Sequence, residues 1–225
     1  MANLISCNSD TSKIYVHSGV SSTITNSFAG PPSAYPEGLT YDGDNLLSCC
    51  RVQDKIYVHS GVSSTITNSF ASPDGWITSL AFDGTHLISG DRTSDKIYVH
   101  SGVSSTVTSS FNVPATLCTA LTYNGTHLIS ADCDTDKIYV HSGVSSTVTS
   151  SFSSPGASPQ GITFNDPHLC TEDYADEEYK VFVHSGVYST VTSSFSTPAT
   201  NHKDLTMDAL TWQTQAIIAT ITCFG

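Results

Sequence analysis

The sequence predicts an all-β protein made of repeated four-stranded units, and three observations support this. A 15-residue stretch, IYVHSGVSSTITNSF in its first copy, occurs five times at intervals of 41 to 43 residues, a spacing typical of stacked structural repeats. Segments of each repeat unit alternate apolar and polar residues and are rich in Ile, Val, Thr and Tyr, as β-strands are. Asp-Gly and Asn-Gly pairs, which are typical of tight hairpins, recur between them. Together these features predict a five-bladed β-propeller.

One unit, residues 38–70, shows how each blade is expected to fold. GLTYD forms an inner strand (A), and DG turns the chain into a second strand, LLS (B). A polar turn leads to KIYVH (C), and SG leads to the outer strand STITNSF (D). The predicted propeller spans residues 1–208, with blade 1 at 3–28 plus 204–208, blade 2 at 38–70, blade 3 at 79–111, blade 4 at 120–152 and blade 5 at 161–195.

The order of strands predicts how the ring closes. The chain begins at a B strand, and its last A strand lies near the C-terminus. Residues 204–208 are therefore expected to complete the N-terminal blade as its inner strand, which removes an open seam. Residues 209–225 remain as a C-terminal extension. Within it, residues 216–224 alternate like a strand and are expected to form either an extra strand or one exchanged with another chain.

Charge and composition exclude several classes of partner. The formal net charge is -12, with only 8 Lys and Arg. Five of the lysines recur at one position of the repeat, so no basic patch is left for phosphates. We therefore expect no binding to nucleic acid or anionic membranes, while neutral glycans, cations and proteins remain as partners.

Targeting signals and cysteines favour a cytoplasmic or virion-associated protein. No run approaches the ~20 apolar residues of a membrane-spanning helix, and the N-terminus lacks the features of a secretory signal. Seven cysteines without zinc-like spacing favour reduced thiols over a disulfide framework. Cys7 and Cys49 are expected in turns, and Cys170 in the core.

The unit GLTYDGDNLLSCCRVQDKIYVHSG resembles the NHL-type propeller repeat, in which a Gly-led strand, a short strand, a polar turn and a basic residue follow one another. It differs from WD-type blades because it has no Trp-Asp dipeptide. The blade number resembles that of tachylectin-type lectins, which use one sugar site per blade, although no sugar-site motif matches. Repeats of the IYVHSGVSST kind are also similar to those of phage and environmental viral proteins, which implies a possible virion location.

Five in-register histidines are the first candidates for chemistry: His17, His59, His100, His141 and His184. Strands in a sheet are ~4.8 Å apart, so a histidine on the third strand lies on the order of 15 Å from the axis. Neighbouring histidines are then too far apart to share a metal ion. We expect each to pack between blades and bond a Ser or Thr, and we expect no cofactor.

Two sets of residues rich in carboxylates need an explanation. Asp42, Asp83, Asn124, Asn165 and Asp208 occupy equivalent hairpin turns, where Asp and Asn are favoured, so turn formation accounts for them. A dense acidic stretch begins at Glu172 in the longest B-to-C turn. It offers a weak candidate cation site, although a solvated acidic loop is the favoured interpretation. The candidate cation ligands are Asp173, Asp176, Glu177 and Glu178.

The five copies differ mainly on one side of the expected disc. Strand direction alternates, so the A-to-B and C-to-D turns share one face, here called the uniform face. The B-to-C and D-to-A loops, such as residues 51–54 and 72–76, share the opposite, variable face. A concave mouth with aromatic and hydrogen-bonding groups suits a sugar or peptide, although drift in unconstrained loops would look the same. The candidate ligand-binding residues at this channel mouth are Tyr35, Glu37, Trp76, Thr78, Thr119, Gln160 and Lys203.

We therefore predict a non-catalytic module that recognises a glycan or protein ligand on the variable face, such as a virion-surface or adhesin-like component. The alternative is a structural protein that forms homo-oligomers through its uncharged blade edges or residues 216–224. A glycoside hydrolase is the least favoured reading. General acid/base chemistry needs a pair of carboxyl groups, and Glu37 is alone among the mouth positions.

Overall fold

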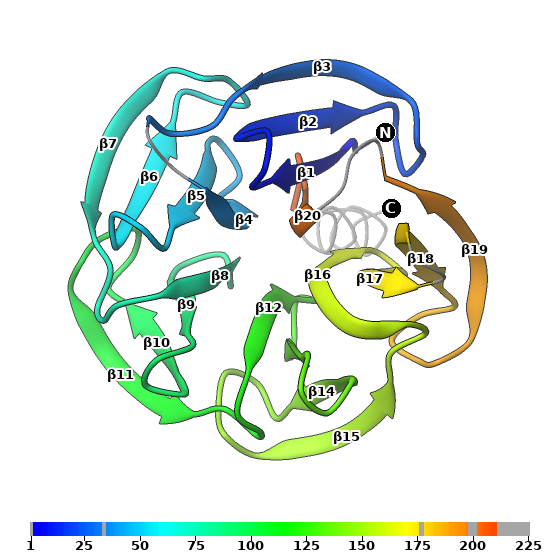
Figure 1. The fold of residues 1–225 in the computed structure, drawn as a ribbon. Coiled ribbons are helices and arrows are strands. Elements are labelled where there is room, and N and C mark those ends of the chain that lie inside the picture. The colour runs from blue at the N-terminus through cyan, green and yellow to red at the C-terminus, as the bar shows by residue number, and fades with distance from the viewer. Residues whose placement is uncertain (1, 33–34, 176–177, 198–201, 211–225) are drawn as a thin grey trace, which may run out of the picture.

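The computed structural model describes residues 2–32, 35–175, 178–197 and 202–210. Twenty strands form five four-stranded antiparallel sheets arranged in a ring, and no helix occurs in these ranges (Figure 1). The chain is therefore the five-bladed β-propeller that the sequence predicts. No helix of the described residues is long and apolar enough to cross a membrane.

Each blade runs from an inner to an outer strand. Blade 1 contains β20 (His202–Met207), β1 (Leu4–Asn8), β2 (Lys13–His17) and β3 (Ile24–Ala29). Blade 2 contains β4 (Pro36–Tyr41), β5 (Leu46–Cys50), β6 (Lys55–His59) and β7 (Ile66–Ala71). Blade 3 contains β8 (Ile77–Phe82), β9 (Leu87–Asp91), β10 (Lys96–His100) and β11 (Val107–Asn112). Blade 4 contains β12 (Cys118–Tyr123), β13 (Leu128–Asp132), β14 (Lys137–His141) and β15 (Val148–Ser153). Blade 5 contains β16 (Ala157–Asn165), β17 (His168–Ala175), β18 (Glu178–His184) and β19 (Val191–Ser196).

The ring closes where the two ends of the described chain meet. Strand β20 pairs antiparallel with β1, with Leu205 opposite Ser6. Just beyond this pairing, the Asp208 carboxylate accepts hydrogen bonds from the backbone N and Nδ2 of Asn3 at 2.6 and 2.8 Å. The predicted closure by a C-terminal inner strand is confirmed.

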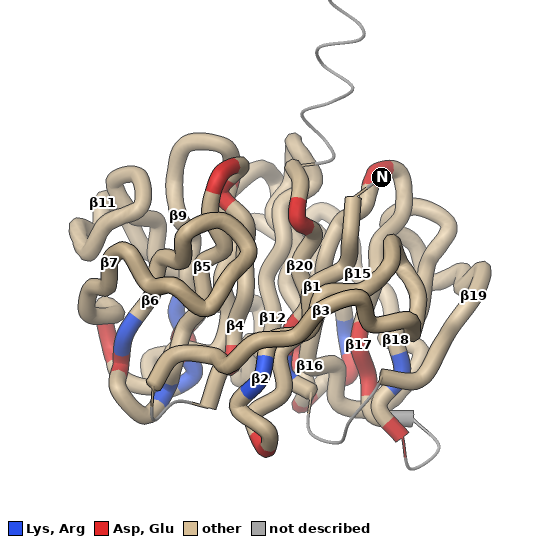
Figure 2. Tube along the Cα trace, turned by 90° about the horizontal axis from the view of Figure 1, so that it is seen from above, with Lys and Arg blue, Asp and Glu red and all other residues tan. Residues whose placement is uncertain are grey.

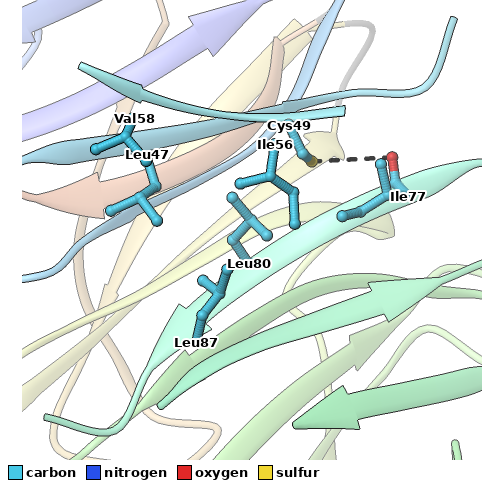
Figure 3. Packing of buried hydrophobic residues seen from close by; sticks show 7 residues of the cluster. All are labelled: Leu47, Cys49, Ile56, Val58, Ile77, Leu80 and Leu87. Atoms are coloured by element: carbon cyan, nitrogen blue, oxygen red, sulfur yellow. Dashed lines mark hydrogen bonds between the residues drawn. The ribbon is translucent and has the colours of Figure 1, made fainter. Parts of the chain in front are cut away.

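Neighbouring blades bury their apolar faces against each other. Between blades 2 and 3, Leu47, Cys49 and Ile56 pack against Ile77 and Leu80 (Figure 3). Similar clusters lie at the other blade junctions. Because one blade cannot bury both of its faces alone, the stability of each depends on its neighbours.

The five histidines on the C strands stabilise this layer. In blade 1, His17 is fully buried, its Nε2 lies 2.9 Å from Ser6 Oγ, and its Nδ1 lies 2.8 Å from Ser21 O. The same arrangement recurs in every blade, with Thr171 in place of the serine in blade 5. Burial lowers the pKa of each of these imidazoles. The predicted structural role of the histidines is confirmed.

Two predictions about the ends of the B strands were wrong. Cys7 and Cys49 were expected in turns, but both are fully buried in β1 and β5. These strands extend further than predicted because the small thiols pack toward the next blade, where they approach the carbonyl oxygens of Pro36 and Ile77. The six cysteines of the described residues are all free.

The acidic stretch of blade 5 also differs from its prediction as a solvated loop. Strand β17 continues to Ala175, so Glu172 and Asp173 lie in a sheet and are fully buried. Asp173 accepts hydrogen bonds from Ser154 Oγ at 2.5 Å and Thr171 Oγ1 at 3.1 Å, which offset part of the cost of burial. Glu178 is exposed at the start of β18, while Asp176 and Glu177 lie outside the described residues.

Candidate functional site on the variable face

A β-bulge recurs in all five inner strands and sets the geometry of the channel mouth. In β4, for example, Pro36 pairs with Cys50 and Gly38 with Cys49, so Glu37 is the extra residue. A bulge redirects a side chain that regular pairing would place elsewhere. The five bulged residues form a ring, here called the bulge ring, consisting of Glu37, Thr78, Thr119, Gln160 and Lys203.

Two of the five residues of the bulge ring join neighbouring blades. Thr78 Oγ1 donates to Cys118 O at 2.9 Å, and Thr119 Oγ1 donates to Pro159 O at 2.6 Å. Both threonines are buried. Their hydroxyl protons are therefore used between neighbouring blades and are not free for a ligand. Gln160 is half-buried, and its amide donates to Ser158 Oγ at 2.8 Å.

Glu37 is the acidic member of the bulge ring and interacts with cations. Its Oε1 lies 3.2 Å from Arg51 Nε, and the carboxyl group is almost completely buried. Burial raises the pKa of Glu37, while the positive charges of Lys203, Arg51 and Arg92 oppose that rise. Three of the chain's eight cationic side chains thus act on this one carboxyl group.

Two aromatic rings and two guanidinium groups extend outward from Glu37 and form the candidate site, here called the arginine–aromatic ladder. It consists of Tyr35, Arg51, Trp76 and Arg92. The guanidinium carbon of Arg51 lies 5.9 Å from the centroid of Tyr35 and 5.6 Å from that of Trp76. The guanidinium carbon of Arg92 lies 5.2 Å from the centroid of Trp76. These distances are those of cation–π contacts.

The backbone holds Trp76 in an unusual conformation. Its φ is 66°, a left-handed value that is rare for a bulky side chain. Its N–H donates to Asp54 Oδ1 at 3.1 Å, and its carbonyl oxygen accepts from Arg92 N at 3.2 Å. The loop thus fixes an indole that remains 42% exposed. The equivalent residue of blade 5, Ser158, has a φ of 62° and donates its N–H to Asp136, so this backbone conformation belongs to the loop and the exposed indole is what is particular to Trp76.

A hollow of about 520 Å³ lies beside the ladder. This volume falls within the range of small-molecule sites, ~300 to 1,000 Å³. Apolar surface from Val52 and Trp76 is combined there with polar groups. The lining residues are Arg51, Val52, Asp54, Gly75, Trp76 and Thr93.

The ladder occurs once per ring. The position of Trp76 is occupied by Leu117 in the next loop and by Ser158 in the one after it. The position shared by Arg51 and Arg92, four residues before the lysine of strand C, is occupied by Ser9 in blade 1 and Cys133 in blade 4. These are the chain's only two arginines.

The opposite mouth of the channel offers little room. A space of about 30 Å³ lies among aromatic and threonine side chains of the inner strands, including Tyr41, Phe82 and Tyr123. This volume suits one or two water molecules. Of these two spaces, the one on the variable face is the larger.

A third group of titratable residues lies inside the ring closure. Glu172, His202 and Asp204 are fully buried where blade 5 meets blade 1. Burial raises the pKa of Glu172 and Asp204 well above their usual range and lowers the pKa of His202 to about 3. His202 Nδ1 lies 3.2 Å from Glu172 Oε1. Perturbed pKa values often mark active sites, but these groups lack the exposure that a substrate requires.

The candidate residues predicted from the sequence meet only in part. Arg51 contacts Tyr35, Glu37 and Trp76, whereas Thr119 and Gln160 lie on other blades and have other contacts. Arg51 and Arg92 were missed, although their restriction to equivalent positions of two consecutive blades was a usable signal. The described residues contain no group of three or more His, Cys, Asp or Glu side chains that could hold a metal ion.

Known proteins resemble this chain only in structure. No protein-family model and no curated protein sequence matches it. A chain from the crystal structure of a nidogen/laminin complex has a TM-score of 0.64 and 15% identity, covering 93% of this chain and 99% of that one. The glutaminyl cyclase of Myxococcus xanthus has a TM-score of 0.61 and 14% identity, covering 83% of this chain and 75% of that one. At these identities the likeness establishes the propeller fold and nothing further.

Proposed function

We propose that this propeller is a recognition module that binds a carbohydrate or protein ligand at the arginine–aromatic ladder. One observation carries the proposal. Tyr35, Arg51, Trp76 and Arg92 come from consecutive blades and meet beside a hollow of about 520 Å³ on the variable face. Concave sites with aromatic surface and a few directed polar groups are where ligands bind. A virion-surface or adhesin-like role is one setting for such a module.

The single ladder favours one ligand per chain over one per blade. Five lectin-like sites would have to use features that all blades share. The shared buried features, such as the His100–Ser89 pair, are already engaged in hydrogen bonds within the blade. The ladder has no equivalent in blade 4, because Leu117 and Cys133 take the positions of Trp76 and Arg92.

The fold by itself does not exclude catalysis, since one of the similar structures is a glutaminyl cyclase. A glycosidase, however, needs two carboxyl groups that can reach a substrate. Glu172 and Asp204 are fully buried, and Glu37 is almost fully buried. A binding role therefore agrees better with this site than acid/base hydrolysis does.

Self-association is the second candidate function, and one observation favours it. The outer strands β3, β7, β11, β15 and β19 carry no charged residue and are mostly exposed. Uncharged outer edges are poorly protected against pairing with another chain. Light scattering on the full chain tests this alternative, since a monomer at high concentration would contradict it. The predicted role of residues 216–224 lies outside the described residues.

A glycan array and an unbiased protein-binding screen test the main proposal. The wild type is compared with Trp76→Ala and with Thr126→Ala, a matched change at an exposed residue of the uniform face. We expect ligands that bind the wild type and Thr126→Ala but lose most affinity for Trp76→Ala. Binding that survives Trp76→Ala unchanged would reject the ladder as the site.

A further inference from the structure

The arginine–aromatic ladder contains unused hydrogen-bond donors. Arg51 forms an ion pair with Glu37, and Glu37 Oε1 makes no hydrogen bond with other described residues. Within the described residues, no carboxylate lies within 4.0 Å of the Arg92 guanidinium. A guanidinium stacked on a ring keeps its edge N–H groups available, and that edge matches the two oxygens of a carboxylate.

The aromatic surface of the ladder is already occupied. Both guanidinium carbons lie within 5.6 Å of the Trp76 centroid, and Arg51 also faces Tyr35. A neutral sugar that needs the open face of an indole would have to displace an arginine. The guanidinium N–H groups that do not face Glu37 remain as recognition elements.

The hollow also contains groups suited to hydroxyls. Asp54 is exposed and uses Oδ1 to hold Trp76 N, so its second oxygen can accept from a ligand. Thr93 is exposed and lines the same hollow. A carboxylate in the lining disfavours a ligand that carries many negative charges, because like charges repel at short distance. The site thus combines donors for one anionic group with acceptors for hydroxyls.

The distribution of charge over the disc points to the same face. Figure 2 shows Lys and Arg only in the lower half of the disc, where strands β2, β6 and β18 begin, while acidic residues occur in both halves. The recurring lysines open strand C in four blades and lie near its start in blade 5, and both arginines lie in B-to-C loops. The upper half corresponds to the uniform face and offers no cation to an anionic ligand.

We propose that the ligand is an acidic saccharide, a sugar with one carboxylate and several hydroxyl groups. Its carboxylate is held by the free edges of Arg51 and Arg92, and its hydroxyls by Asp54 and Thr93. This inference rests on the proposed function, because it assigns a ligand class to the same site. An acidic peptide with several carboxylates adds charges that Asp54 repels.

Calorimetric titration with two singly charged saccharides tests the inference: 3′-sialyllactose and a glucuronic-acid-terminated disaccharide. The carboxyl methyl ester of each is the matched neutral probe. We expect at least one acid to bind at least tenfold more tightly than its ester, because hydrogen bonds between charged groups are the stronger kind. Arg92→Gln should remove that preference, whereas Arg92→Lys should restore only part of it, since lysine lacks the planar fork.

The outcomes separate this inference from the proposed function. If acid and ester bind equally and both lose affinity with Trp76→Ala, the site stands and the acidic preference is wrong. If an oligoglutamate peptide binds at the ladder more tightly than either saccharide, the saccharide assignment is overturned. If neither acid binds folded wild type in the millimolar range, the acidic-saccharide inference fails, while the array and protein screen still decide the proposed function. Thermal unfolding confirms that each variant remains folded.

Discussion

The repeated framework and the variable face are made by the same five blades, but they differ in what repeats. In the framework, buried pairs such as His100 with Ser89 recur in four blades, and blade 5 replaces only the serine, by threonine. On the variable face, Trp76 has Leu117 and Ser158 at its equivalent positions. The comparison teaches that the recurring residues are explained by packing and hydrogen bonding. Function is best sought where the copies depart from one another.

The substitution Asp204→Ala tests the ring closure, where the framework departs from the repeat. Asp204 occupies a position that holds glycine or alanine in three other blades, and it accepts hydrogen bonds from the backbone N–H groups of Leu39, Leu205 and Ile162 at 2.8, 2.8 and 3.4 Å. Asp204→Ala should lower the free energy of unfolding by about 4 kcal/mol, because it leaves buried donors unpaired at ~1 to 3 kcal/mol each. Urea unfolding measures this loss.

Ser79→Ala is the matched control, since Ser79 holds the same position in blade 3. We expect that change to alter the free energy of unfolding by less than about 1 kcal/mol, as is usual when no group is left unpaired. Equal losses for both variants would mean that the closing strand is no different from the other inner strands.

Replacing the framework histidines should have the next largest effect. His100→Ala leaves Ser89 Oγ and Ser104 O without their partner and opens a cavity, so we expect a loss of about 3 kcal/mol. The same substitution of His17, His59 or His141 should cost a similar amount, because their surroundings repeat. A spread among the four variants of more than about 2 kcal/mol would break the claim of a uniform framework.

His202 predicts a pH dependence at the ring closure, in the same direction as that of the five framework histidines, whose pKa values burial also lowers. Its pKa is about 3 in the folded state, against ~6.5 when unfolded, so the unfolded state takes up the proton first. Its contribution to stability is complete above pH ~6.5 and is lost as the pH falls, by up to about 1.4 kcal/mol per pH unit. The buried carboxyl groups of Glu172 and Asp204, whose pKa values are raised, act in the opposite direction.

A variant isolates this contribution from the opposing carboxyl groups. His202→Gln should lose less stability than wild type between about pH 7 and about pH 5, by roughly 2 kcal/mol. Urea unfolding at the two pH values measures the difference. Identical pH profiles would show that His202 does not resist protonation in the folded state.

Of these substitutions, replacing Trp76 should have the smallest effect on stability and the largest effect on ligand binding. Trp76→Gly removes cation–π contacts worth ~0.5 to 1 kcal/mol each but relieves a left-handed backbone that costs ~1 kcal/mol. The free energy of unfolding should therefore change by less than about 1 kcal/mol while ligand affinity falls. A large loss of stability would place Trp76 in the framework.

The sequence predicts the fold well because its signals are local and repeated. The hairpin turns and the alternation within each unit specify the blade, and Leu205 in the last A strand specifies the closure. The bulge ring was beyond such reasoning, since one extra residue per strand leaves no mark in the pattern and changes where Thr78 and Thr119 point. The burial of Glu172 was also hidden, because it depends on blade 5 having longer strands than its sisters.

The candidate site was predictable only in its aromatic half. Tyr35 and Trp76 stand out in otherwise polar loops. Their contacts with Arg51 and Arg92, by contrast, join loops that precede different strands. Tyr35 and Arg51 are 16 residues apart in the sequence, and so are Trp76 and Arg92. Antiparallel pairing within one blade brings each pair together, since Pro36 lies opposite Cys50 and Ile77 opposite Asp91. Only the contact of Arg51 with Trp76 joins two neighbouring blades.

The most direct test of the central claim is the number of ligand molecules bound per chain. It is measured by calorimetric titration of the tightest ligand from the array or screen, with wild type and Trp76→Ala at equal folded concentration. The account predicts one molecule per wild-type chain and no measurable binding to the variant. A value near five, or a titration that Trp76→Ala leaves unchanged, would place recognition on the repeated framework and contradict the account.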